Sequence, residues 1–265
     1  MLRNFTNRPK NPNIRIWRYM DLPKYISLLA TRSLYFSRSD LLGDHFEGSF
    51  PPLNAKDRTT YYRNLFRGQD WTKYNNVIEK FSLGQTYIHK LVLPRVYINC
   101  WHSNSIESHA MWELYSQREK GIAIRSTYRR LRGCLPMDIN IGLVKYINYS
   151  KTSRSKIPED IPIAPFFYKR KSYEHEKELR AIYFNDLNTD EMKGLNLIVP
   201  LPDDYFEKQK KGYSFPVDLD NLIENIYIHP FVEPWLLEAI TDLTIKYGLS
   251  SKLIRRSTLE RTPLY

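Results

Sequence analysis

The chain has 265 residues, 42% hydrophobic and 14% aromatic, and is therefore long enough to bury a sizeable core. A charged fraction of 26%, with 10 glycines and 16 prolines, excludes a disordered, collagen-like or coiled-coil chain. No apolar run approaches the roughly 18 residues of a membrane-spanning helix, and no signal peptide is evident. The absence of such a run predicts no membrane partner, and the presence of only two cysteines, Cys100 and Cys134, excludes a disulfide scaffold. We therefore expect a protein of the reducing cytoplasm.

The positive charge is concentrated in two segments. Forty Lys and Arg against 29 Asp and Glu leave a net charge of +11. Residues 1–40 hold eight basic and two acidic side chains, and residues 118–156 hold ten and two. This distribution predicts a polyanionic partner such as DNA or RNA, whereas a scattered, solvated positive surface is the alternative. The central candidates for nucleic-acid binding are Arg125, Arg129, Arg130 and Arg132.

The order of predicted elements is that of an α+β chain. Alternating apolar residues predict strands over residues 14–19, 33–38, 96–101, 121–125, 143–149 and 179–184. Helices are predicted after Asp21, over much of 55–92, over 106–117 and from Pro234 to the helix-ending Gly248, with a last strand or extended tail at 251–257. We therefore predict one α+β domain over residues 1–265, with a mixed central sheet flanked by helices. The strands around Tyr19, Tyr35, Ile98, Ile124 and Ile182 should share that sheet.

Several common chemistries are absent from the sequence. The glycines are isolated, so no phosphate-binding loop is present, and no G-x-S-x-G nucleophile motif occurs. Cys100 and His102 have no second pair at ligand spacing, and we predict no metal site. Asp186, Glu191 and Lys193 form an acidic pair with an E-x-K fragment, which keeps a nuclease as a minor alternative.

Other polar residues interrupt elements that otherwise predict core positions. Arg18 and Tyr19 lie on the first predicted strand, and Trp112 and Tyr115 share one face of a predicted helix, where core packing is the alternative. In Tyr173-Glu-His-Glu-Lys-Glu-Leu-Arg180 the charges are densest. If its second half is extended, Glu176, Glu178 and Arg180 share a face, and surface ion pairing is the alternative.

Three segments resemble a bacterial pattern of C-F-S, then M-W-x-x-Y, then glycine with alternating apolar residues: Asn99-Cys-Trp-His-Ser103, Ala110-Met-Trp-Glu-Leu-Tyr115 and Gly121-Ile-Ala-Ile124. The pattern belongs to the family numbered 2971 among domains of unknown function. Further similar segments extend the match over nearly the whole chain: Arg18-Tyr19, Leu34-Tyr-Phe-Ser37, Asp44 to Glu47, Tyr173 to Arg180 and Val217 to Pro230. Trp101-His102 and Gly43-Asp44-His45 depart from the family pattern.

The order of these parts is also similar to the layout of ADP-ribosyltransferases, which runs Arg or His, then Ser or Tyr, then Glu. This similarity implies a toxin or defence effector that transfers ADP-ribose from NAD to a nucleic-acid or protein acceptor. It implies catalytic roles for Glu176 and Glu178. The residues implied to bind NAD are Arg18, Tyr19, Ser37, Trp112, Tyr115 and Arg180. The competing hypothesis is a non-catalytic nucleic-acid-binding module, which has no use for buried glutamates.

Overall fold

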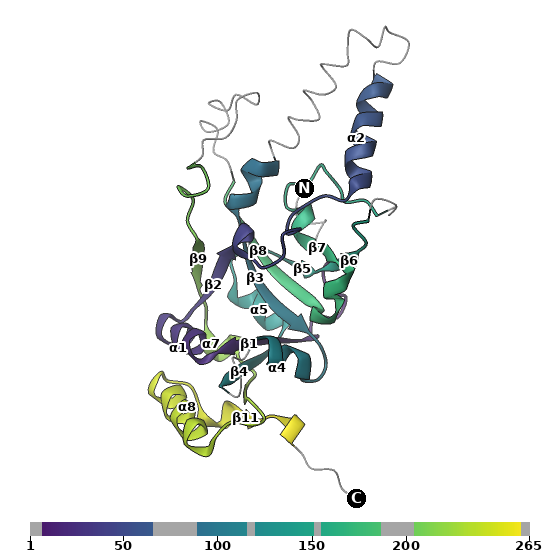
Figure 1. Cartoon of the computed structure of the whole chain (residues 1–265). Coiled ribbons are helices and arrows are strands. Elements are labelled where there is room, and N and C mark those ends of the chain that lie inside the picture. The colour runs from purple at the N-terminus through teal and green to yellow at the C-terminus, as the bar shows by residue number, and fades with distance from the viewer. Residues whose placement is uncertain (1–6, 66–88, 116–119, 151–154, 187–203, 261–265) are drawn as a thin grey trace, which may run out of the picture.

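The central strand β3 (Val96–Ser103) organises the sheet of this protein (Figure 1). The computed structural model describes residues 7–65, 89–115, 120–150, 155–186 and 204–260. Along one edge, β3 pairs with β8 (Glu178–Phe184), which pairs in turn with β5 (Asn140–Leu143). Both pairings are antiparallel. The register between β3 and β8 sets Cys100 opposite Arg180 and His102 opposite Glu178, so these four side chains project from one face.

The other edge of β3 is shared by two strands. β2 (Ser33–Arg38) pairs with the first half of β3, and β1 (Arg15–Asp21) pairs with the end of β3. Outward from these lie β9 (Gly212–Pro216) beside β2, and β4 (Gly121–Thr127), β10 (Asn225–Ile228) and β11 (Ile254–Arg256) beyond β1. In the described sheet of nine strands only β10 and β11 pair in parallel, so the chain is a single α+β domain with a mixed sheet, as predicted.

Side chains bridge the point where β1 and β2 diverge along β3. The Arg18 guanidinium donates Nη1 to the Cys100 carbonyl oxygen at 3.0 Å, and Asn99 donates Nδ2 to the Tyr35 carbonyl oxygen at 2.8 Å. Both acceptors are backbone carbonyl oxygens that face the gap between the diverging strands. Because buried backbone groups must be hydrogen-bonded, these two side chains take the place of a strand partner.

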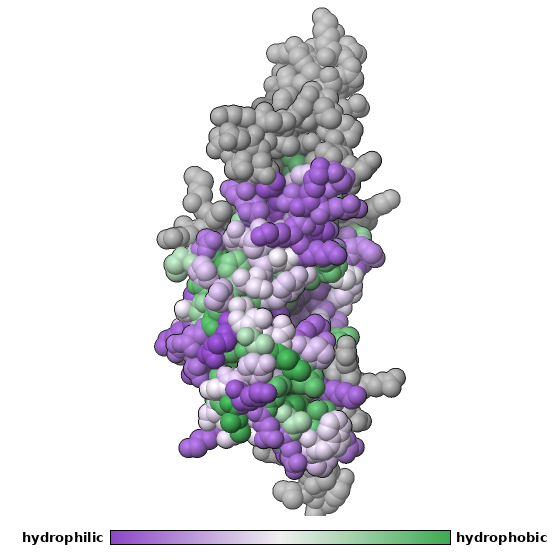
Figure 2. Space-filling model, turned by 90° about the vertical axis from the view of Figure 1, so that its left-hand side faces the viewer, coloured by the Kyte–Doolittle hydropathy of each residue, from purple (hydrophilic) through white to green (hydrophobic). Residues whose placement is uncertain are grey.

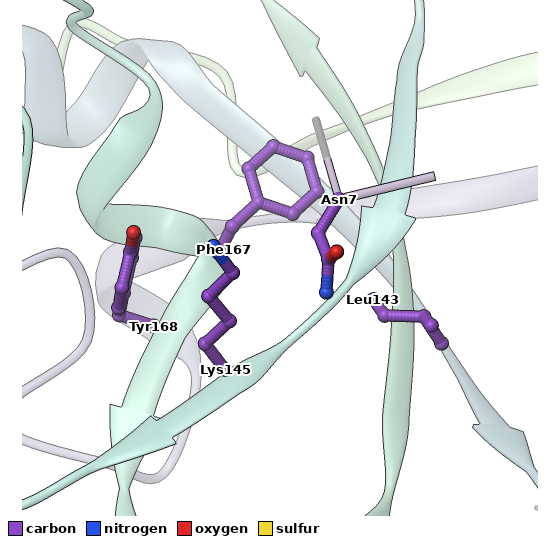
Figure 3. A pocket seen from close by; sticks show the side chains of 5 residues that line it. All are labelled: Asn7, Leu143, Lys145, Phe167 and Tyr168. Carbon is purple, nitrogen blue, oxygen red and sulfur yellow. The ribbon is translucent and has the colours of Figure 1, made fainter. Parts of the chain in front are cut away.

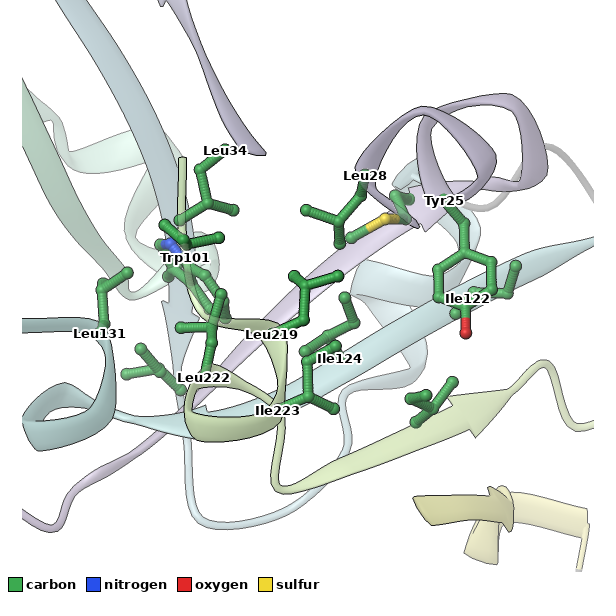
Figure 4. Packing of buried hydrophobic residues seen from close by; sticks show 14 of the residues in the cluster. Tyr25, Leu28, Leu34, Trp101, Ile122, Ile124, Leu131, Leu219, Leu222 and Ile223 are labelled. Atoms are coloured by element: carbon green, nitrogen blue, oxygen red, sulfur yellow. The ribbon is translucent and has the colours of Figure 1, made fainter. Parts of the chain in front are cut away.

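Helices cover one face of the sheet over the larger apolar core (Figure 4). They are α1 (Leu22–Thr31), α5 (Tyr128–Cys134), α7 (Leu219–Leu222) and α8 (Pro234–Lys246). As predicted, Asp21 caps α1 by accepting from the Lys24 backbone N–H at 2.9 Å, with proline in the first turn. Seen from the side of β9, α1 and α8, apolar surface gathers over the lower part of the molecule (Figure 2).

The opposite face carries two smaller apolar clusters. Helix α4 (His109–Tyr115) packs Trp112 against Trp17 and Tyr19. The second cluster lies under the short parallel pair of β6 (Lys145–Ile147) and β7 (Tyr168–Arg170). Glu178 and Arg180 project from β8 on this same face. Within the described ranges, no helix is long and apolar enough to cross a membrane.

The five strands expected in a common sheet are all in it. Some boundaries differ from the prediction: the expected strand 143–149 is divided between the end of β5 and β6, and the helix expected over 106–117 starts at His109. Helix α2 (Pro52–Leu65) lies within the helical region expected over 55–92, of which residues 66–88 lie outside the described ranges. The tail expected at 251–257 contains a 3-10 turn and the short strand β11.

Candidate functional site

A buried group of charged residues lies on the face of the sheet beneath α4 and β7. We call it the charged cluster, and it consists of Glu47, Lys169, Glu176, Glu178 and Arg180. Strand β8 supplies Glu178 and Arg180, and Glu176 ends the preceding 3-10 turn (Lys171–Glu176). Lys169 comes from β7 and Glu47 from the loop after β2. All four elements converge, so residues separated by more than 130 positions meet.

Arg180 is the centre of the charged cluster and is 1% exposed. Both Glu47 oxygens accept from its terminal nitrogens, at 2.6 and 2.9 Å. Glu178 accepts from Nε at 2.7 Å and Nη2 at 3.3 Å, and the Phe166 carbonyl oxygen accepts from Nη1 at 2.7 Å. All five guanidinium donors are thereby used, which is how a buried arginine avoids a large desolvation cost. This guanidinium has no donor left for a ligand phosphate.

A tight turn places Glu47 against Arg180. The Glu47 N–H donates to the Asp44 carbonyl oxygen at 2.9 Å, and Arg170 donates Nη2 to the Asp44 carboxylate at 2.6 Å. Gly48 follows with a φ of +68°, and a Cβ there would lie 2.4 Å from the Phe166 ring. Only glycine fits this backbone and this contact.

Glu176 and Glu178 meet at one cation. Lys169 donates Nζ to Glu176 Oε2 and, at 2.7 Å, to Glu178 Oε1. Lys177, between the two glutamates, has a left-handed backbone with a φ of 39°. This residue makes the change from 3-10 turn to strand, and on either side of it both carboxylates face Lys169.

The two glutamates have opposite pKa shifts. Burial, together with the hydrogen bond and charge of Glu178, raises the pKa of Glu176 to about 7. Burial alone would also raise the pKa of Glu178, but the Arg180 charge and hydrogen bonds hold it well below its usual value. A carboxylate pair that holds one proton near neutrality is an arrangement typical of acid–base sites.

Aromatic residues and one histidine surround Glu176. Tyr115, 42% exposed, donates its hydroxyl to Glu176 Oε1 at 3.5 Å. The Tyr173 ring lies 4.5 Å from Lys169 Nζ, and Tyr146 accepts the Glu178 N–H at 2.7 Å. His102 donates Nδ1 to the Glu176 carbonyl oxygen at 2.7 Å and so fixes its main chain. Glu176 is thus the member of the charged cluster that contacts the partly exposed Tyr115.

The structure brings together four of the predicted site residues, namely Tyr115, Glu176, Glu178 and Arg180. Arg18 bonds to the Cys100 carbonyl oxygen, with Trp101 6.0 Å away, and makes no bond to the glutamates. Trp112 is fully buried, 5.0 Å from the Tyr19 ring, and donates Nε1 to Glu107, as the core-packing alternative expected.

The remaining predicted residues also lie away from the charged cluster. The Tyr19 hydroxyl accepts the Ser108 N–H at 2.9 Å, and the Ser37 hydroxyl faces the Arg38 carbonyl oxygen at 3.5 Å. Of the nuclease candidates, Glu191 and Lys193 lie outside the described residues.

The four arginines expected to bind nucleic acid do not form one free row. Arg125 bonds to Glu224 at 3.1 Å, to the Tyr227 hydroxyl at 2.9 Å and to Asn225. Arg132 donates to the carbonyl oxygens of Leu135, Pro136 and Ile139. Arg130 donates one Nη1 bond to the Asn221 carbonyl oxygen but is exposed, and Arg129 is exposed. Two of the four therefore serve the fold.

Three residues of this site are not among the site residues predicted from the sequence: Glu47, Lys169 and Tyr146. A buried Arg180 needs carboxylate partners, and this requirement could have pointed to Glu47. The acidic residues of loop 43–48 were candidates for such a partner. Lys169 directly follows the buried residues Phe166, Phe167 and Tyr168, which also marks it as a charge at a core boundary.

A small pocket lies beside the end of β5 and the first residues of β6 and β7. It is lined by Asn7, Leu143, Lys145, Phe167 and Tyr168 (Figure 3), none of which belongs to the charged cluster. Across the described ranges, no three His, Cys, Asp or Glu side chains are placed to hold a metal ion. Comparison with family models, curated proteins and solved structures found no match for this chain. Both sequence resemblances therefore stay predictions.

Proposed function

We propose that the protein is an enzyme that breaks the bond between nicotinamide and ribose in NAD and transfers the ADP-ribosyl group to an acceptor. The observation that carries the proposal is the glutamate pair, in which Glu176 titrates near neutrality while Glu178 stays ionised. The reaction needs a carboxylate beside a ribose carbon that becomes positively charged in the transition state.

Glu176 is the reacting carboxylate in this proposal. The C1′–N bond breaks, and its electron pair leaves with nicotinamide, which becomes neutral. The acceptor O–H or N–H attacks C1′, and its proton passes to Glu176. Glu178 holds Lys169 and Arg180 and remains ionised behind it.

The surroundings of Glu176 suit the substrate. Tyr115 is exposed enough to stack on nicotinamide, whereas Trp112 is fully buried and could not contact the substrate. The exposed Lys171 and Lys177 flank Glu176 in the chain and would pair with the diphosphate. Arg180 keeps its five internal bonds, so it positions Glu178 and does not bind phosphate.

The test is release of labelled nicotinamide from NAD by the parent chain and by Glu176→Gln. We expect the variant to lose at least about 100-fold in turnover, because it has neither charge nor basicity. Parent activity should rise with pH through about 7, as Glu176 ionises. Glu174→Gln, an exposed neighbour on the same turn, is the matched control and should keep full activity.

Two outcomes contradict the proposal. One is the absence of NAD consumption by the parent with protein and nucleic-acid acceptors supplied. The other is a Glu176→Gln variant that consumes NAD at the parent rate. In either case the charged cluster is a structural ion network, the alternative that the sequence left open.

A further inference from the structure

The structure brings parts of the two basic segments together at α5. The N–H of Arg129 donates to the Pro12 carbonyl oxygen at 2.8 Å, and that of Tyr128 donates to the Ile14 carbonyl oxygen at 3.2 Å. Residues 12–14 therefore run along the first turn of α5, and Lys10 precedes them by two positions. The charge of Arg8 also acts on Arg132. We call these cations the basic surface, and it consists of Arg8, Lys10, Arg129, Arg130 and Arg132.

The cations of the basic surface differ in how their donors are used. Lys10 and Arg129 are exposed, and no carboxylate among the described residues forms an ion pair with either. Arg130 is exposed and spends one donor on Asn221, whereas Arg132 contributes charge but gives its donors to backbone oxygens. The basic surface thus combines exposed side chains that have unused donors, Lys10 and Arg129, with the charge of Arg132, whose donors are bonded within the fold.

Among the described residues, the two acids next to α5 in the chain or in space form no bond to Lys10 or Arg129, which are exposed cations of the basic surface. Asp138 acts on Arg132 from the loop after α5. Asp218 accepts from the N–H groups of Asp220 and Asn221 and so caps α7. Asp138 thus offsets part of the charge of Arg132, whereas the Asp218 carboxylate is bonded within its own turn.

We propose that the basic surface binds the phosphate backbone of double-stranded nucleic acid without reading its bases. Exposed ammonium and guanidinium groups with unused donors are what phosphate oxygens bind. Single strands are instead held by exposed aromatic rings, and within the described part of this surface the one ring, Tyr128, is half-buried against the core.

This binding is separate from the proposed NAD chemistry. Leu131 fixes α5 to the larger core on one face of the sheet, whereas the charged cluster lies on the other face. Loss of one function therefore leaves the other measurable. The residue set also differs from the sequence prediction, since Arg125 is bound to Glu224 and Lys10 joins Arg129.

The experiment measures fluorescence anisotropy of a labelled 20-base-pair duplex at rising salt, with the full chain. Three or four phosphate contacts should reduce the affinity by about 40- to 150-fold between about 50 and 200 mM salt. The double variant Lys10→Glu, Arg129→Glu should bind at least about tenfold more weakly with a shallower salt slope. The matched control is Lys246→Glu, Lys252→Glu, which makes the same charge change at exposed residues on and after α8 and should bind like the parent.

Several results overturn the proposal. They are no binding at low salt, salt-independent binding, or equal losses in the two double variants. Tighter binding of a single strand contradicts the duplex assignment. Displacement of the duplex by polyglutamate at equal charge concentration assigns the basic surface to an acidic protein instead. Unfolding curves that match the parent show that the variants are folded.

Discussion

Arg180 and Glu178 illustrate how a charge is kept inside an apolar sheet. Moving ions out of water costs several kcal/mol each, and this cost is offset only where the hydrogen bonds are complete. Arg180 has all five donors bonded, and both Glu178 oxygens accept from cations. Removing one partner leaves the other charge buried and unpaired, which is the larger penalty.

We therefore expect Glu178→Gln and Glu47→Gln each to lower the free energy of unfolding by about 3–5 kcal/mol. Glu176→Gln should cost clearly less, because Lys169 keeps Glu178 as its partner. Urea denaturation with the exposed Glu174→Gln as control measures the three effects. A Glu178→Gln variant as stable as the parent would show that Arg180 finds another partner or water.

The proton on Glu176 gives a second prediction at this scale. Its pKa is about 7 in the folded chain and near 4.5 in the unfolded chain, so between these values the folded state holds the extra proton. The stability that Glu176 contributes is therefore full below about pH 4.5 and is lost as pH rises towards 7. Glu178, whose folded pKa is depressed, loses its contribution only as pH falls below its usual range.

Denaturation of the parent and of Glu176→Gln at pH 5 to 8 isolates this effect. Burial lowers the pKa of His102, which works in the opposite direction in the same window, but His102 is present in both proteins. The difference in unfolding free energy should shift in favour of the variant as pH rises. A difference independent of pH would place the pKa of Glu176 near its usual value.

At the scale of elements, apolar alternation was enough to predict β1, β2, β3, β4 and β8. Each has at least two successive apolar residues on one face, and the period of two is then visible in the sequence even where a polar residue interrupts it. β7 has only three residues, and β9 begins with a glycine and ends with a proline, so neither gives a periodic signal. The site was predictable only in part for a similar reason: β8 shows its own charges, but Glu47 reaches Arg180 across 133 positions.

The loop that carries Glu47 gives the prediction at this scale. Gly48→Ala should lower the free energy of unfolding by more than about 1 kcal/mol, because its φ is +68° and its Cβ would meet the Phe166 ring. Gly43→Ala is the matched control in the same loop, since a Cβ there meets nothing within 4 Å. Urea denaturation compares them, and equal stability of the two variants would mean that the loop relaxes without cost.

At the scale of the whole molecule, the end of the described chain returns to the helix that carries Tyr115. β11 adds to the sheet beside β10, and residues 257–258 then reach Glu107, just before α4. Glu107 is buried, and its two oxygens accept four bonds. The donors are Trp112 Nε1, the Ser257 hydroxyl, and the N–H and hydroxyl of Thr258. One carboxylate thus joins the sheet edge, the tail and the α4 cluster.

Glu107→Gln tests this connection with almost no change in shape. An amide replaces one acceptor oxygen by a donor NH₂ group, so whichever way it turns, two of the four donors lose their acceptor. We expect the Thr258 amide to exchange its hydrogen at least about tenfold faster, while amides of the central β3 keep the parent rate, because the tail opens locally. Glu113→Gln, an exposed carboxylate on α4, is the control. Unchanged exchange at Thr258 would show that β11 holds the tail without Glu107, whereas faster exchange throughout β3 would make Glu107 part of the global fold.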